Sequence, residues 1–140
     1  MTDDPTYRKL YETSKLTVGH SYEYAYLTKR SIFNFKKTTM IGWFIYDPTC
    51  ALISYDNSWC LVGGDRLLLW TPKQTFEIDD DNLKSIEAFR QIDLYTVHIL
   101  IDPWADNSAI WEFNIQTKQR KKLRDFNDYK DQEYTDDIKW

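Results

Sequence analysis

The residues able to do chemistry are few in this chain of 140 residues, and their spacing matches no usual metal site. Only two histidines and two cysteines are present, without a C-x-x-C or H-x-x-x-H arrangement. The acidic run that starts at Asp79 begins like a calcium loop. However, Leu83 stands where the next oxygen ligand should be, and no glycine supplies the bend. We therefore expect neither a bound metal nor a cofactor.

Covalent catalysis and phosphate binding also lack their motifs. No G-x-S-x-G elbow is present, and Gly63-Gly64 is not followed by the Lys-Ser/Thr pair that completes a phosphate-binding loop. His20 and His98 fall in strand patterns, where a packed and hydrogen-bonded ring is the expected role. Asp102 and Asp106 flank a turn, where we expect solvated carboxylates rather than an acid–base pair. The sequence predicts a protein without enzymatic activity.

The elements that must position any site are short and β-rich. Between residues 40 and 71, three turn signals separate apolar runs: Asp47-Pro48, Asp56-Asn57 and Gly63-Gly64-Asp65. This spacing predicts an antiparallel meander as the core sheet. Its expected strands are 40–46, 50–55, 58–63 and 66–71.

A turn at Asp56-Asn57 also predicts the register, because it places Ile53 opposite Cys60 with alternate side chains on opposite faces. One face would carry Ala51, Ile53, Tyr55, Cys60 and Val62, and the other would carry Leu52, Trp59 and Leu61. Both faces are apolar, so we expect strands that are covered on both sides. Cys50 and Cys60 would point to opposite faces as free thiols, which agrees with a reducing compartment.

The remaining segments complete a single β-dominated domain, residues 1–140. Acidic and proline residues predict a short helical segment within residues 1–15. A second short helix is expected over 83–90, with a strand as the alternative. Further strands are expected over 16–27, 75–78, 92–102, 109–115 and 120–126. The Trp-rich runs are similar to propeller blades, but the chain has room for too few blades to close. We predict an antiparallel β-sandwich or half-barrel of seven to nine strands, with a β core over 16–126.

Two flanking segments have a distinct composition. Lys29-Arg30 and Lys36-Lys37 bracket Ile32, Phe33 and Phe35, which predicts a second strand or an exposed hairpin before the meander. Residues 127–140 form an acidic tail, either mobile or folded into a short docking helix. No apolar stretch reaches the roughly 18 residues of a membrane span, and the acidic N-terminus is unlike a signal peptide. We therefore expect a cytoplasmic protein that does not contact membranes.

Charge is distributed unevenly along the chain. The formal net charge is −4, and residues 38–117 contain twelve acidic but only four basic side chains. One basic run could bind single-stranded nucleic acid beside aromatic strands; it contains Lys118, Arg120, Lys121, Lys122 and Arg124. The acidic balance opposes phosphate binding, and an edge strand protected by charge explains the same run. A nucleic-acid-binding β domain and a small-ligand-binding β-barrel stay as alternatives.

Recognition of another protein is the function class that remains. Acidic clusters accelerate association with a basic surface, and tryptophans near turns are common anchors. In size, acidity, aromatic β content and lack of catalytic motifs, the whole chain resembles bacterial immunity proteins, which neutralise contact-dependent-inhibition and other polymorphic toxins. The resemblance implies an inhibitor, a monomer or weak dimer, that occludes the active site of a cognate toxin, expected to be a cationic nuclease domain. The acidic clusters predict a partner-binding surface made of Asp79, Asp80, Asp81, Asp102, Trp104, Asp106, Asp136 and Asp137.

Overall fold

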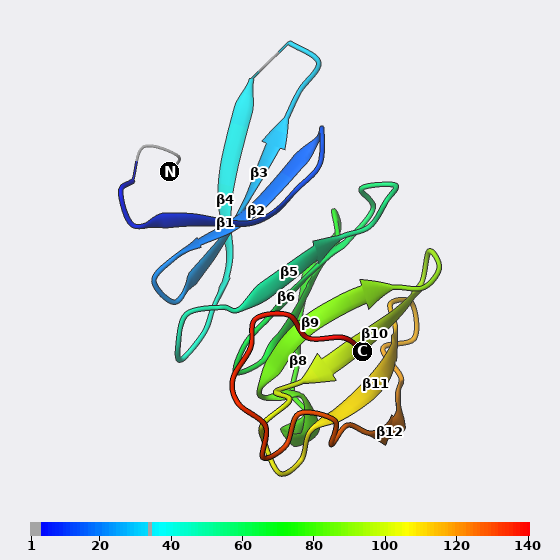
Figure 1. The fold of residues 1–140 in the computed structure, drawn as a ribbon. Coiled ribbons are helices and arrows are strands. Elements are labelled where there is room, and N and C mark those ends of the chain that lie inside the picture. Colours follow the sequence, from blue (N-terminus) through cyan, green and yellow to red (C-terminus); the bar gives the residue numbers. More distant parts are fainter. Residues whose placement is uncertain (1–3, 34) are drawn as a thin grey trace.

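Twelve β-strands build the described part of this computed structural model, residues 4–33 and 35–140, and form three antiparallel sheets (Figure 1). Strands that follow one another in sequence pair side by side in each sheet. The first sheet contains β1 (Tyr7–Glu12), β2 (Leu16–Ser21), β3 (Tyr24–Arg30) and β4 (Lys36–Trp43). The second contains β5 (Cys50–Ile53), β6 (Cys60–Gly63), β7 (Leu67–Trp70) and β8 (Thr75–Ile78). The third contains β9 (Ile86–Gln91), β10 (Thr96–Ile101), β11 (Ala109–Asn114) and β12 (Arg120–Asp125).

The three sheets stack face to face in sequence order, with the second sheet in the middle. One face of the middle sheet packs against the first sheet through residues such as Val62 and Leu27. Its other face packs against the third sheet through residues such as Leu61 and Ile99. Strand β5 contacts both β1 and β9, so the first strands of the three sheets are neighbours along the stack. The arrangement is similar to three consecutive propeller blades in an open stack, since closing a ring takes about four or more.

The register predicted around the turn at Asp56-Asn57 is confirmed. Ile53 pairs with Cys60, and Leu52 pairs with Leu61. Ile53 and Cys60 belong to the core shared with the first sheet, whereas Leu52 and Leu61 belong to the core shared with the third. The predicted two-sided burial follows from this alternation, because successive side chains on a strand point to opposite faces.

The two thiols and Trp59 follow the same register. Cys60 is buried in the core on the first-sheet side, while Cys50 packs against the core on the third-sheet side, and both thiols are free. Trp59 is 2% exposed, and its indole Nε1 donates a hydrogen bond to the Leu94 carbonyl oxygen at 2.9 Å. Trp59 is therefore part of the core and not an exposed binding residue. Tyr55, assigned above to a packed face, is instead exposed in the turn.

The predicted N-terminal helix within 1–15 is wrong for the residues described, because Tyr7–Glu12 forms β1; residues 1–3 lie outside the described chain. Pairing with β2 satisfies the backbone of this segment and packs Leu10 against the core, which outweighs a weak local helix preference. The predicted strand over 16–27 is two strands, since the chain reverses at Tyr22, where φ is 51°. No glycine, asparagine or proline marks that turn.

The helix expected over 83–90 is also wrong, and the strand alternative is right. A single 3-10 turn, η1 (Asp81–Leu83), is capped by the Asp80 side chain, and β9 follows. Leu83 and Ile86 are both buried, so their three-residue spacing reflects a turn followed by a strand rather than one helix face. The structure thus has more strands than the seven to nine predicted, and β4 places the expected strand 40–46 in the first sheet, not in the meander.

The C-terminal segment beyond β12 forms neither a helix nor a strand, yet it is packed against the domain. Tyr129, Ile138 and Trp140 lie on the outer face of the third sheet, over Leu100 and Ile110. In Figure 1 this segment, drawn in red, runs back along that sheet. The described chain contains no helix that is long and apolar enough to cross a bilayer.

Candidate functional site

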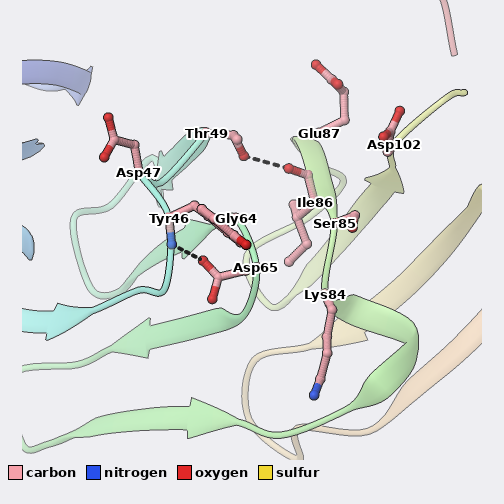
Figure 2. A pocket seen from close by; sticks show the side chains of 10 residues that line it. All are labelled: Tyr46, Asp47, Thr49, Gly64, Asp65, Lys84, Ser85, Ile86, Glu87 and Asp102. Carbon is pink, nitrogen blue, oxygen red and sulfur yellow. Dashed lines mark hydrogen bonds between the residues drawn. The ribbon is translucent and has the colours of Figure 1, made fainter. Parts of the chain in front are cut away.

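An acidic cleft lies where the second and third sheets meet (Figure 2). The β4–β5 connection, the β6–β7 turn, the start of β9 and the end of β10 form its walls. Its volume is about 230 Å³. The lining residues are Tyr46, Asp47, Thr49, Gly64, Asp65, Lys84, Ser85, Ile86, Glu87 and Asp102.

Backbone hydrogen bonds between the two sheets hold the base of the cleft. The Ile86 amide donates to the Gly64 carbonyl oxygen at 2.9 Å, and the Thr49 hydroxyl donates to the Ile86 carbonyl oxygen at 2.6 Å (Figure 2). On the third sheet, the Asp102 amide donates to the Ser85 carbonyl oxygen at 2.7 Å. These bonds fix the start of β9, and so they fix the position in the cleft wall from which the Glu87 side chain projects.

Asp65 shapes the opposite wall. Its carboxylate accepts hydrogen bonds from the amides of Ile45, at 3.0 Å, and Tyr46, at 3.2 Å, and so holds the β4–β5 connection against the β6–β7 turn. Gly64 allows the close approach, because a Cβ atom there would lie 3.3 Å from the Pro48 Cα atom. The turn residues therefore act as a scaffold that brings Asp47 to the same cleft.

The charge of the cleft is negative. Asp47, Asp65, Glu87 and Asp102 line it, and Lys84 is the single basic residue among the described residues of the lining. Arg66, outside the lining, pairs with Asp65 at 3.7 Å and offsets part of its charge. The Lys84 ammonium pairs with Asp81 at 3.0 Å, so part of its charge is already neutralised. The negative potentials of carboxylates gathered in one concave site add together, so the site favours a cationic ligand.

The pKa of Glu87 is affected by the negative charge of the cleft. Desolvation by the surrounding chain raises the pKa of Glu87, and the charges of Asp102 and Asp136 raise it further. Asp136 in turn accepts a hydrogen bond from the Tyr134 hydroxyl at 2.6 Å, which raises the pKa of Tyr134. A carboxyl that resists ionisation because of neighbouring carboxylates would be stabilised by an incoming cation.

Packing of the C-terminal segment brings Asp136 into this set. The Trp104 indole Nε1 donates to the Gln132 carbonyl oxygen at 3.1 Å, and the Trp104 ring centroid lies 5.1 Å from that of Tyr134. Tyr129 stacks on Phe126 with ring centroids 5.8 Å apart. Trp104, predicted as a partner-binding residue, therefore anchors the chain's own C-terminal segment.

The predicted acidic residues separate into two groups. Asp102 lines the cleft and Asp136 lies within electrostatic reach of Glu87, so these two come together. The others lie outside the cleft lining, and most have ionic partners of their own. Those pairs are Asp80 with Arg120, Asp81 with Lys84, Asp106 with Lys130 and Asp137 with Lys139; Asp79 precedes the η1 turn.

Asp47, Asp65 and Glu87 were missed by sequence reasoning. Asp47 and Asp65 lie in turns that were used above only to mark where strands end. In a meander, however, alternate turns lie at the same end of the strands. That rule could have placed Asp65 close to the β4–β5 connection. Nothing local distinguishes Glu87, which reaches the cleft because the Ile86 amide at the start of β9 donates a hydrogen bond to the Gly64 carbonyl oxygen of the middle sheet.

The basic run lies on β12, an exposed edge strand of the third sheet. Its cations are largely matched by neighbours: Arg120 pairs with Asp80 at 2.7 Å, Lys122 with Asp125, and Arg124 with Asp128 at 3.7 Å. The Lys118 ammonium lies 3.9 Å from the centre of the Phe76 ring. This position agrees with the protected-edge explanation, and the paired charges reduce what the run can offer to a phosphate backbone.

A second hollow, of about 660 Å³, opens at the other end of the same two sheets. Phe76, Tyr95 and Ile115 contribute apolar surface to it. It is an open depression between turns and not an enclosed barrel cavity, so it offers a small apolar ligand little burial.

The histidines and comparisons with known proteins add no further site. The Nδ1 atom of His20 lies 2.8 Å from the Tyr22 carbonyl oxygen, and the Nε2 atom of His98 lies 3.3 Å from Glu112. Within residues 4–33 and 35–140, no group of three or more His, Cys, Asp or Glu side chains is arranged to hold a metal ion. No protein-family model matches the chain, and no curated protein matches it. The acidic cleft is therefore the candidate functional site of the described chain.

Proposed function

We propose that the protein binds a cationic protein partner at the acidic cleft and acts as an immunity-type inhibitor of a toxin domain, such as a nuclease. The observation that carries the proposal is the gathering of Asp47, Asp65, Glu87 and Asp102, with Asp136 nearby, from separate parts of the chain. A nuclease active site is lined by cations that bind phosphate, so an acidic surface is its electrostatic complement. Covering such a site blocks the substrate without any chemistry by the inhibitor.

The size of the cleft favours a protein side chain over a free small molecule. Its volume of about 230 Å³ falls below the range of roughly 300–1,000 Å³ that is usual for small-molecule pockets. An extended Lys or Arg side chain would enter with its cation among the carboxylates. Arginine suits the site best, because its guanidinium can bind two carboxylates at once.

Relief of repulsion at Glu87 would contribute to binding. Desolvation raises the pKa of Glu87 most, and the charges of Asp102 and Asp136 raise it further, so both carboxylates oppose its negative charge in the free protein. A cation placed between them removes that opposition, so the site binds a cation more strongly than an isolated carboxylate would. The same field extends into solvent and increases the association rate at low salt.

The first test asks whether a gene beside that of this protein encodes a toxin-like domain, and it uses that domain. Co-expression should suppress the toxicity of that domain, and the purified proteins should form a complex. The double variant Glu87→Gln with Asp102→Asn should slow association at low salt by about tenfold or more and flatten its salt dependence.

Asp56→Asn with Asp93→Asn is the matched control. Like the test variant, it removes two negative charges, but these lie in the β5–β6 and β9–β10 turns. Those turns are at the far ends of strands that start at the cleft. The control should associate like the unmodified protein. If a toxin domain binds both double variants equally well, the cleft is not its binding site. If the unmodified protein does not suppress toxicity at all, it has no immunity function.

A further inference from the structure

The β3–β4 hairpin carries an exposed apolar tip. Ile32 is 91% exposed, and Phe33 and Phe35 are each 74% exposed. In Figure 1 this hairpin projects away from the second and third sheets. Asn34 lies outside the described residues. Three large apolar side chains held in water at one tip are unfavourable for an isolated domain and typical of an interaction site.

Four cations stand directly behind the tip, in pairs of like charge. The register places Lys29 opposite Lys37 and Arg30 opposite Lys36. Like charges directly opposite each other across two strands destabilise a sheet. Arg30 is balanced by Glu12 at 2.6 Å, and Lys29 lies 5.2 Å from the centre of the Trp70 ring. The described chain provides no such acidic partner for Lys36 or Lys37, so the neck of the hairpin keeps a net positive charge.

Three backbone amides of the tip, those of Ser31, Phe33 and Phe35, donate hydrogen bonds within the hairpin. The Ser31 hydroxyl oxygen accepts from the amides of Phe33, at 3.3 Å, and Phe35, at 3.2 Å. The Ser31 amide donates to the Phe35 carbonyl oxygen at 2.9 Å. Backbone groups without partners are costly to move out of water, so these bonds lower the cost of bringing the three amides into an apolar environment.

We propose that this hairpin is an interfacial anchor for an anionic lipid bilayer. Ile32, Phe33 and Phe35 enter the boundary between headgroups and acyl chains, while the cations behind them contact lipid phosphates. Phe33 lies four residues from both Lys29 and Lys37, which is at most about 13 Å of chain. Interfacial segments bury their apolar face by about 5–10 Å, so the cations remain at the headgroup level.

A lipid surface fits these observations better than a protein partner. A bilayer presents an anionic layer above an apolar layer, and the hairpin presents apolar residues beyond cations in the matching order. A protein partner would need a groove shaped for three neighbouring large side chains. The expectation of no membrane contact rested on the lack of an apolar run long enough to span, and interfacial binding needs no such run.

The rest of the charge distribution would orient the molecule on the surface. Strand β4 runs from Lys36, beside the tip, to Trp43, and the connection that follows enters the acidic cleft. Cations and carboxylates therefore lie toward opposite ends of this strand. An anionic surface attracts the hairpin and repels the cleft, so the cleft stays free for a protein partner. The anchor does not depend on the function proposed for the cleft.

Vesicle sedimentation tests the proposal with the full chain. The protein should bind vesicles of phosphatidylcholine mixed with phosphatidylglycerol, bind phosphatidylcholine vesicles more weakly, and lose the difference at high salt. Phe33→Ser with Phe35→Ser should lower the partition coefficient at least about tenfold. Lys36→Glu with Lys37→Glu should lower it by at least as much on the mixed vesicles.

Controls separate an effect at the tip from general changes. Tyr55→Ser changes an exposed aromatic residue elsewhere, and Lys73→Glu with Lys121→Glu makes the same charge change away from the hairpin; both should bind as the unmodified protein does. Thermal unfolding of each variant verifies that it is folded. No binding of the folded, unmodified chain to the mixed vesicles would overturn the proposal and favour an acidic protein as the occupant. Binding that survives both hairpin variants would overturn it as well.

Discussion

The Nε atom of Arg120 donates to the Oδ2 atom of Asp80 at 2.7 Å and joins the edge strand β12 to the turn that precedes β9. One residue of the basic run and one of the acidic run, forty positions apart, thus stabilise each other. Burial raises the pKa of Asp80, but the hydrogen bonds from Arg120 and Asn82 outweigh it and hold that pKa below its usual value. The sequence predicted Asp80 on a partner-binding surface, and it placed Arg120 in the basic run considered for the nucleic-acid-binding alternative.

Asp80→Asn should lower the free energy of unfolding by about 1–2 kcal/mol at pH 7. The substitution keeps a side chain that can cap η1 and removes the charge that Arg120 binds. Because the pKa of Asp80 is depressed in the folded state, its contribution is complete above the unfolded value and disappears as pH falls through the folded value. Urea unfolding at neutral pH and near pH 3 measures both. An equal loss of stability at the two pH values would contradict the ionic explanation.

Glu87→Gln should change stability in the opposite direction. The pKa of Glu87 is raised in the folded protein, so the folded state holds this proton more tightly and stability declines as pH rises through the raised value. The Gln variant should therefore be more stable than the unmodified protein at pH 7 and equally stable below the unfolded pKa. Chemical unfolding across pH 4–8 measures the difference. In an Asp136→Asn background the gain should shrink, because one source of the repulsion is absent.

Gly63→Ala should destabilise the protein by about 1–3 kcal/mol through overpacking. A Cβ atom at Gly63 would lie 2.7 Å from a methyl group of Ile86 and 2.8 Å from the Phe89 ring, in the contact between the second and third sheets. The φ angle of this glycine is not positive, so backbone strain does not contribute. Gly64→Ala is the comparison and should cost less, because its nearest contact, with the Pro48 Cα atom, would be tight at 3.3 Å but not overlapping. Equal losses for both variants would argue against tight packing of the two sheets at Gly63.

Tyr129→Ala should release the C-terminal segment from the third sheet. The Tyr129 ring packs against Phe126 and Trp104, and its hydroxyl oxygen accepts from the Lys139 amide at 2.9 Å. Loss of these contacts should raise amide hydrogen exchange at Lys139 and reduce stability by about 2–4 kcal/mol. Tyr134→Ala, at a largely exposed residue, should cost less. Unchanged exchange in the Tyr129 variant would mean that other contacts hold the segment.

Local sequence signals were sufficient where a turn and a period-two pattern agreed. The Asp56-Asn57 turn and the alternating residues around it predicted both the pairing of Ile53 with Cys60 and the two faces of the middle sheet. The same reasoning failed at Tyr22, where an ordinary residue adopts a positive φ, and at Leu83 and Ile86, where a turn and a strand together imitate helical spacing.

The sequence composition was enough to identify acidic candidate residues. It did not show which of them lie together in the folded protein. Asp102 and Asp136 were identified among the acidic turns and the tail, yet their common neighbour Glu87 was not. Their grouping depends on β9 meeting the middle sheet at Gly64 and on the C-terminal segment folding back over the third sheet. Neither contact is encoded by residues close in sequence.

The sequence by itself determined the β character of the chain, the register around Asp56-Asn57, the two apolar faces of the middle strands and the lack of familiar catalytic motifs. Turn propensity and side-chain alternation act between residues near one another, so these features are readable along the chain. Only the tertiary structure decided which carboxylates are neutralised, as Asp80 is by Arg120, and which converge without an ion pair of their own in the described chain, as Asp102 and Glu87 do. Coulomb interactions depend on distance and desolvation in space, and the stacking of the three sheets sets both.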